Sequence, residues 1–302
     1  MRALAEFVMR GRPQAMGAAL VCSILPLLNW LGAAIVSLVI LRKGAAEGFL
    51  VLLWAGLPLM VGLYLAGGVN PTPLIWLVSA ALLAYVLRVT MSWELTVVST
   101  VIIAGIGTVI FELTAVDLLA QFSAYYVDYA AQVTEGALQL TESEAKDTVM
   151  SFVAMGQAIA LVVVLVLARW WQSMLFNPGG FRQEFHALRL SPSITTPLVI
   201  AMLSCVVFTD QLGRWLPLLS MPLLVSGIGF VHWFLDHRKM SVQWAVMFYL
   251  AIVMLLQLVY PILASLALID SWLDLRSRLS PPGPPAPPQD GEHQLPERKE
   301  EE

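Results

Sequence analysis

The chain has 302 residues, of which 58% are hydrophobic and only 13% charged, and its mean hydropathy is +0.76. Soluble domains carry about 25% charged residues, so this composition excludes a water-soluble fold. The net charge of −4 and the lack of a basic field exclude nucleic acid as a partner.

The first segment, residues 1–13, carries three arginines ahead of a long apolar stretch. Leu4, Phe7 and Val8 share one face of a helix at this spacing. A basic, amphipathic helix of this kind lies in the membrane interface. We therefore predict a cytoplasmic surface segment at the N-terminus.

The apolar block at residues 14–41 is interrupted near Leu28 and Asn29, so it is either one kinked span or a hairpin of two short helices. A kinked span places the basic residues of the later loops outside, against the accumulation of Lys and Arg in cytoplasmic loops. A hairpin places them in the cytoplasm with the N-terminus and leaves only Lys146 and Arg214 outside before the tail. We therefore predict the hairpin, in a bacterial inner membrane.

Further apolar blocks follow the hairpin, and most approach the roughly 20 residues that a spanning helix needs. They occupy residues 48–66, 73–90, 95–113, 149–168, 197–209, 216–235 and 242–269. Together they predict an all-α fold, a polytopic transmembrane helix bundle of about eight or nine segments over residues 14–275. Pro261 interrupts the last block, which crosses the membrane or turns back there, so the side of the C-terminus stays open.

Three segments outside these apolar blocks have patterns that predict their own local structure. Residues 114–147 show apolar and aromatic side chains at helical spacing, which predicts an outer amphipathic helix, and Thr141 with Glu144 fits a capping box for the next helix. Residues 177–195 predict a turn and a short helix on the inner face. The tail, residues 280–302, is rich in proline and then in charge, which predicts disorder.

Sequence signatures of enzymes and of nucleotide binding are absent from the chain. No lysine follows a glycine, so there is no P-loop, and neither H-E-x-x-H nor G-x-S-x-G occurs. We therefore predict no enzymatic activity, no metal and no cofactor. If transport by this protein uses ATP, a separate subunit must supply the ATPase.

Polar residues near the predicted outer ends are the best candidates for a binding site, because burying ionisable groups in lipid is costly. Glu112 and Asp210 both lie near the outer ends of predicted spans, and the positive-inside rule does not account for a carboxylate there. We expect an outward-facing polar pocket for a small-molecule ligand, rimmed by Glu112, Asp117, Tyr125, Tyr126, Gln157 and Asp210. The alternative is carboxylates at wet helix ends beside an aromatic belt.

A stripe of small residues, Ala15, Ala19 and Ser23, runs along the first apolar segment. Small residues at this spacing let two helices approach closely, either within one chain or between chains. Packing within the chain is the default expectation for such a stripe.

The chain resembles the YybS-like family of bacterial membrane proteins. The resemblance is carried by MRALAEFVMRGRPQA at residues 1–15, LRKG at 41–44, the inner loop at 181–192 and IDSWLDLR at 269–276. That family is distantly similar to the S components of energy-coupling-factor transporters, which bind substrates and rely on a coupling subunit and paired ATPases. The resemblance implies that Ala15, Ala19 and Ser23 form a docking stripe, with serine in place of the last alanine.

Two functions remain open from the sequence. The first is a substrate-binding component for the uptake of a small solute, energised by ATPase and coupling subunits. The alternative is a membrane scaffold or regulatory protein that recruits cytoplasmic partners through the inner loop, by way of Phe181, Phe185 and Arg189, and through the tail. The ligand itself is not predicted, because the chain matches no known vitamin-binding motif and has more spans than an S component.

Overall fold

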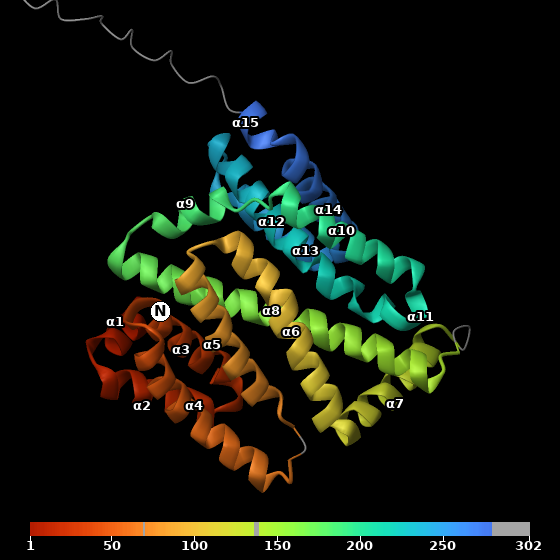
Figure 1. Cartoon of the computed structure of the whole chain (residues 1–302), viewed down its shortest axis with the longest axis horizontal. Coiled ribbons are helices and arrows are strands. Elements are labelled where there is room, and N and C mark those ends of the chain that lie inside the picture. Colours follow the sequence, from red (N-terminus) through yellow and green to blue (C-terminus); the bar gives the residue numbers. More distant parts are fainter. Residues whose placement is uncertain (69, 136–138, 280–302) are drawn as a thin grey trace, which may run out of the picture.

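The computed structural model describes residues 1–68, 70–135 and 139–279, and the regular elements of these ranges are all helical (Figure 1). In chain order the helices are α1 (Arg2–Arg10), α2 (Arg12–Ile24), α3 (Asn29–Lys43), α4 (Ala45–Leu65), α5 (Thr72–Thr90), α6 (Trp93–Thr114), α7 (Val116–Val133), α8 (Glu142–Phe176), α9 (Gly180–Ala187), α10 (Pro192–Val207), α11 (Thr209–Leu212), α12 (Leu216–His237), α13 (Val242–Met254), α14 (Leu256–Leu273) and α15 (Leu275–Leu279). The predicted all-α bundle is confirmed. The tail predicted at 280–302 lies outside the described residues.

The N-terminal block forms two helices, α2 and α3, joined by a 3₁₀ turn at Pro26–Leu28. They pack closely, because a Cβ placed on Gly32 of α3 would lie 2.9 Å from the Ser23 hydroxyl and 3.4 Å from the Ala19 carbonyl oxygen of α2. This is the hairpin that the distribution of basic residues predicts. Ahead of it, α1 packs on the bundle through Val8, which is buried.

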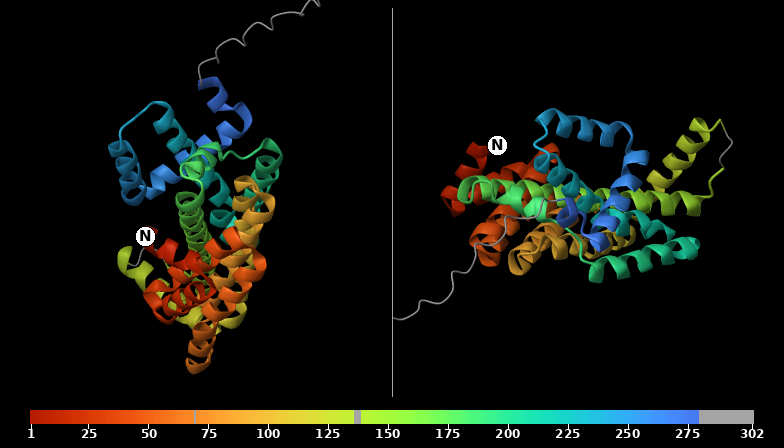
Figure 2. Two further views of the ribbon diagram at one scale, coloured as in Figure 1. Left: turned by 90° about the vertical axis from the view of Figure 1, so that its left-hand side faces the viewer. Right: turned by 90° about the horizontal axis from the view of Figure 1, so that it is seen from above.

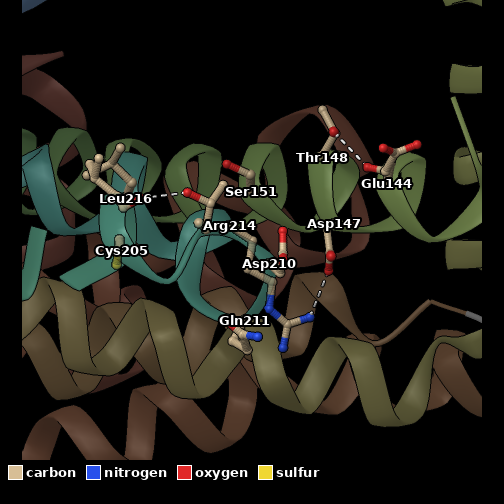
Figure 3. Close-up of a pocket in the computed structure, with 12 residues that line it drawn as sticks. Glu144, Asp147, Thr148, Ser151, Cys205, Asp210, Gln211, Arg214 and Leu216 are labelled. Carbon is tan, nitrogen blue, oxygen red and sulfur yellow. Dashed lines mark hydrogen bonds and ion pairs between the residues drawn. The ribbon is translucent and has the colours of Figure 1, made fainter. Parts of the chain in front are cut away.

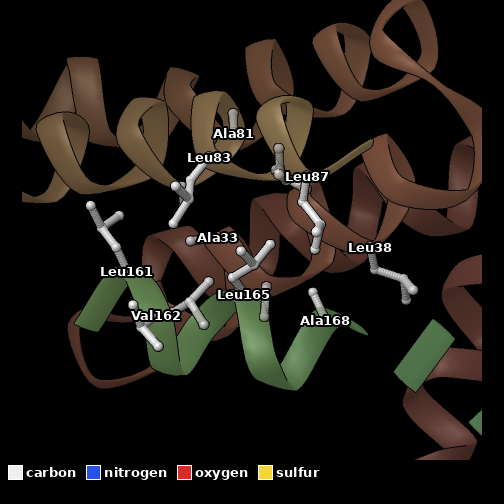
Figure 4. Packing of buried hydrophobic residues seen from close by; sticks show 14 of the residues in the cluster. Ala33, Leu38, Ala81, Leu83, Leu87, Leu161, Val162, Leu165 and Ala168 are labelled. Atoms are coloured by element: carbon white, nitrogen blue, oxygen red, sulfur yellow. The ribbon is translucent and has the colours of Figure 1, made fainter. Parts of the chain in front are cut away.

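Helix α3 lies at the centre of the bundle and contacts α2, α4, α5 and α8. Its side chains from Gly32 to Leu41 are all buried, including the fully enclosed Ile35 and Leu38. A helix that is apolar on every side lies either among other helices or in lipid, and the burial of α3 shows that other helices surround it. Figure 4 shows side chains of α3, α5 and α8 meeting in this core.

The surface of the bundle is suited to lipid. Helix α4 exposes large apolar side chains such as Leu53, Leu57 and Val61. Water would penalise such a surface by about 25 cal/mol per Å². Within the described residues, seven helices are long and apolar enough to cross a membrane, or eight if α9 and α10, which meet at a bend of 60°, form one broken span. The chain is therefore a multi-pass integral membrane protein.

Basic residues from several loops gather at one end of the bundle, which we call the basic end. Arg12 pairs with Glu47 at the start of α4. Arg88, at the end of α5, donates to the carbonyl oxygens of Ile40 (3.1 Å) and Leu41 (2.6 Å). Gln172, near the end of α8, donates to the same Leu41 carbonyl oxygen (3.2 Å), so the loops after α3, after α5 and after α8 lie together with the N-terminus, as the hairpin requires.

The C-terminal helices differ from the sequence prediction in one respect. The chain breaks at Leu255, between α13 and α14, and Pro261 lies inside α14. A proline removes an amide donor and crowds the preceding turn, so the break falls upstream of Pro261 and not at it. After α14, Arg276 donates to the Leu188 carbonyl oxygen beside α9 (2.6 Å). The described chain thus ends beside α9, and the left view of Figure 2 shows its last helix, in blue, above the green ribbon.

Candidate functional site

The first half of helix α8 lies at the end of the bundle opposite the basic end and contributes side chains to two hollows there. The 35 residues of α8 span about 52 Å, longer than the roughly 30 Å hydrocarbon core of a bilayer. The predicted capping box is present: the Glu144 amide donates to the Thr141 hydroxyl (3.3 Å), and the Thr141 amide donates to the Glu144 carboxylate (2.8 Å). The first half of α8 lines two different hollows, one on each face.

The first hollow, which we call the aromatic pocket, lies between α5, α6, α7 and α8 and has a volume of about 570 Å³. Small-molecule sites in proteins usually measure about 300–1,000 Å³ and are mostly apolar. None of the described residues that line this pocket is Asp, Glu, Lys, Arg or His. Its lining consists of Asn70, Thr72, Trp76, Phe111, Leu118, Phe122, Tyr125, Tyr126, Val149, Phe152, Val153, Gly156 and Gln157.

Aromatic side chains from α7 and α8 form the outer wall of the aromatic pocket. The Tyr126 ring meets the Phe152 ring edge to face, with centroids 6.0 Å apart and an interplanar angle of 72°. Tyr125 stacks on Tyr129 along α7, with centroids 6.5 Å apart. The segment predicted at 114–147 is thus an aromatic-faced helix at 116–133 that covers the pocket.

The polar group at the inner end of the aromatic pocket is the amide of Gln157. Gln157 is 3% exposed, and its side-chain nitrogen Nε2 has no hydrogen-bond partner among the described residues. A Cβ placed on Gly107 of α6 would overlap this nitrogen, so only glycine leaves room for the amide. Gln157 follows Lys146 by about 16 Å along α8, so the amide lies deep below the end of the bundle.

The second hollow, which we call the charged cleft, lies on the opposite face of α8, against α10, α11 and α12 (Figure 3). Its volume is about 680 Å³. Ionisable groups line it, namely Glu144, Asp147, Asp210 and Arg214. At about 3.6 residues per turn, Asp147 and Ser151 point away from the face that carries Val153 and Gln157.

The charges around this cleft pair with one another. Glu112, at the end of α6, accepts from Lys146 of α8 (2.9 Å) and from Arg214 (3.3 Å), and Arg214 also approaches Asp147 (3.5 Å). Arg214 precedes α12, so this network connects α6, α8 and α12. Arg214 and Glu112 are mostly shielded from water, so their hydrogen bond stabilises by about 1.5–3 kcal/mol, whereas Lys146 and Asp147 are about half exposed and contribute less.

The predicted site residues are divided between these places. Tyr125, Tyr126 and Gln157 line the aromatic pocket, whereas Asp210 lines the charged cleft. Glu112 belongs to the ion-pair network. Asp117 is exposed on α7 and lines neither hollow.

Sequence reasoning missed Trp76, Phe111 and Phe152 as lining residues, because aromatic residues near helix ends also form membrane belts. It also missed the pairing of Glu112 with Lys146 and Arg214. The sequence did contain a signal for this pairing. Lys146 and Arg214 are the two basic residues predicted on the outer side before the tail, and Glu112 is a carboxylate predicted on the same side.

The small-residue stripe is used within the chain. Ala15, Ala19 and Ser23 are 1%, 0% and 3% exposed, and α2 packs against α3 and α4. These side chains are therefore covered by the chain's own helices, which is the default expectation for a stripe of this kind.

The inner loop is fastened to the bundle. Phe181 contacts Trp93 edge to face (5.9 Å between centroids), and Phe185 contacts His232 in the same way (5.6 Å). Arg189 donates to the carbonyl oxygens of Asp270 and Ser271, both at 3.0 Å. The three residues predicted as an interaction surface thus contact α6, α12 and α14 of the same chain.

A buried ion pair closes the basic end next to this loop. Arg276 donates to the carboxylate of Asp270 (3.0 Å), and Asp270 is 1% exposed. Burial lowers the pKa of the Arg276 guanidinium, although the neighbouring Asp270 carboxylate acts in the opposite direction. The pair holds α9 and the end of α14 together.

Comparisons of the chain with protein-family models, with curated proteins and with solved structures found no match. The candidate site therefore rests on the geometry alone.

Proposed function

We propose that this protein is a binding component for the uptake of a small solute, and that the aromatic pocket holds the solute. The observation that carries the proposal is the Gln157 amide, which is buried at the inner end of the pocket with Nε2 unpartnered. Leaving a buried donor unpaired costs about 1–3 kcal/mol, so a ligand that accepts from it gains binding free energy.

The orientation of the bundle supports uptake. By the positive-inside rule, the basic end faces the cytoplasm of a bacterial inner membrane, and the N-terminus lies there with it. The aromatic pocket lies toward the other end, near the end of α6 and the start of α7, which is the outer side in this orientation. A solute is then captured before it crosses the membrane.

Energy for uptake comes from separate ATPase and coupling subunits in this proposal, in keeping with the absence of a P-loop from the sequence. The resemblance to YybS-like proteins, and through them to S components, points the same way. Because Ala15, Ala19 and Ser23 are buried, a coupling subunit has to contact another surface of the bundle.

Affinity purification in mild detergent, followed by mass spectrometry of bound proteins and small molecules, tests the proposal. We expect one dominant small solute on the wild-type protein and its loss from Gln157→Leu, because the variant lacks the amide donor. Recovery of an ATPase with a coupling subunit would add the energising partners. Recovery of no solute, together with soluble cytoplasmic proteins, would contradict the proposal and favour a scaffold or regulator.

A further inference from the structure

The aromatic pocket excludes charge from its lining. A charged ligand there would leave water without meeting a counter-ion, which costs several kcal/mol in a low-dielectric site. Glu112, which follows the lining residue Phe111, pairs with Lys146 (2.9 Å), and Asp117, which precedes the lining residue Leu118, is exposed on α7. Among the described lining residues only neutral polar groups are present, such as Asn70, Thr72 and Gln157.

The Gln157 amide selects for an acceptor. Within the described part of the chain its Nε2 has no hydrogen-bond partner, and contact with Gly107 fixes its place. A carbonyl, ether or hydroxyl oxygen can accept from it. A cation could stack on the aromatic faces, as in aromatic cages, but the amide hydrogens at the inner end would repel it.

The shape of the aromatic pocket fits a flat or compact apolar body. Trp76 and Phe111 lie on α5 and α6, and Tyr126 and Phe152 face them from α7 and α8. Tyr125 and Phe152, at the mouth, are 70% and 61% exposed. An exposed aromatic mouth beside an amphipathic helix suits entry from the membrane interface, where tyrosine side chains are favourable.

We infer that the aromatic pocket binds an uncharged amphipathic molecule whose oxygen accepts a hydrogen bond from Gln157. This inference rests on the proposed function and names the class of solute. Charge is excluded by the lining, the oxygen is required by the unpartnered amide, and the apolar body is required by the aromatic walls.

Cysteine protection in the full-length protein, reconstituted in lipid nanodiscs, tests the inference. Val153→Cys places a thiol in the aromatic pocket, on a background in which Cys22→Ala and Cys205→Ala remove the native thiols. The neutral reagent 2-hydroxyethyl methanethiosulfonate labels the new thiol. Three probes share one ring system and differ in charge: 2-naphthamide is neutral, 2-naphthoate is an anion and 2-(aminomethyl)naphthalene is a cation at pH 7.

We expect 2-naphthamide alone to protect the thiol, with labelling about fivefold slower at four times its dissociation constant. Gln157→Leu should abolish this protection. Gln157→Asn keeps an amide but shortens its reach, and should reduce protection while the protein stays folded. Labelling of Ser151→Cys, on the other face of α8, reports whether each variant is folded and should not respond to any probe.

Other outcomes would overturn the inference. Equal or stronger protection by the anion or the cation would reject a neutral ligand while leaving a solute-binding pocket in place. Protection by the amide that survives Gln157→Leu would reject the hydrogen bond. No protection by any probe would reject the ligand class, and recovery of a solute from the purified protein would then still support the proposed function.

Discussion

The two faces of α8 differ in how their polar groups are satisfied. On the face toward α10 and α12, Arg214 meets Glu112 and Asp147, so the partly buried positive charge has partners within the chain. On the face toward α6 and α7, the buried amide nitrogen of Gln157 has no partner among the described residues, and the pocket that Gln157 lines is largely aromatic. A ligand gains most from a group that the protein itself leaves unpaired.

Size alone does not separate the two hollows, since their volumes are about 680 Å³ and 570 Å³. The charged cleft carries the ionisable residues that draw attention in a sequence. In the folded chain two of those residues, Asp147 and Arg214, pair with each other, and Arg214 also pairs with Glu112 of α6. The aromatic pocket has the composition of a small-molecule site, with apolar walls and few polar groups.

Loss of the charge network should have the largest effect on stability. We expect Arg214→Gln to lower the free energy of unfolding by about 2 kcal/mol, because Glu112 and Asp147 lose a partner that is mostly shielded from water. Titration with SDS in mixed micelles measures this change. The matched control, Arg10→Gln, removes an exposed charge at the basic end and should change stability by less than about 0.5 kcal/mol.

Protection of Val153→Cys by 2-naphthamide should remain intact in Arg214→Gln. If the folded variant loses that protection, the charged cleft takes part in binding, and the division of roles between the two faces is wrong.

Charged reagents should distinguish the two faces next. In Val153→Cys we expect the neutral methanethiosulfonate to react about tenfold faster than the trimethylammonium or sulfonate forms, because the aromatic pocket offers no counter-ion. In Ser151→Cys we expect the cationic form to react faster than the anionic one, since three carboxylates and one arginine line the charged cleft. Identical reactivity patterns at the two half-buried positions would contradict the comparison.

A smaller effect should follow from Gly107→Ala. The new methyl group displaces the Gln157 amide, so 2-naphthamide should bind about threefold more weakly, which corresponds to about 0.7 kcal/mol. Gly17→Ala is the control, because a Cβ at Gly17 meets open space. Unchanged binding in a folded Gly107→Ala variant would show that the position of the amide does not matter.

Much of the fold could be predicted from the sequence, because apolar blocks, basic loops and a capping box are local signals. The hairpin of α2 and α3 followed from where Arg42, Lys43 and Arg88 lie in the chain, and Thr141 with Glu144 marked the start of α8. Boundaries were less exact. The inner loop was predicted to reach residue 195, but α10 already begins at Pro192, since proline suits the first turn of a helix.

The candidate site could be predicted only in part. Tyr125, Tyr126 and Gln157 drew attention as polar or aromatic residues near the outer end, and they line one pocket. Glu112 belongs to the ion-pair network and Asp210 lines the charged cleft, so both lie apart from these three residues. That separation depends on how α6 and α12 pack against α8, which neither the spacing nor the composition of the sequence reveals. The role of Gly107 depends on one close approach between two helices.

Experimental density for the full-length protein purified from its membrane into nanodiscs, at a resolution that shows side chains, would test the binding role of the aromatic pocket. A binding role predicts non-protein density between Trp76, Tyr126 and Phe152, with a polar atom within hydrogen-bonding distance of Gln157 Nε2. A pocket that is closed, with the Gln157 amide bonded to a neighbouring helix, would contradict it. So would density of a lipid acyl chain that makes no contact with the amide.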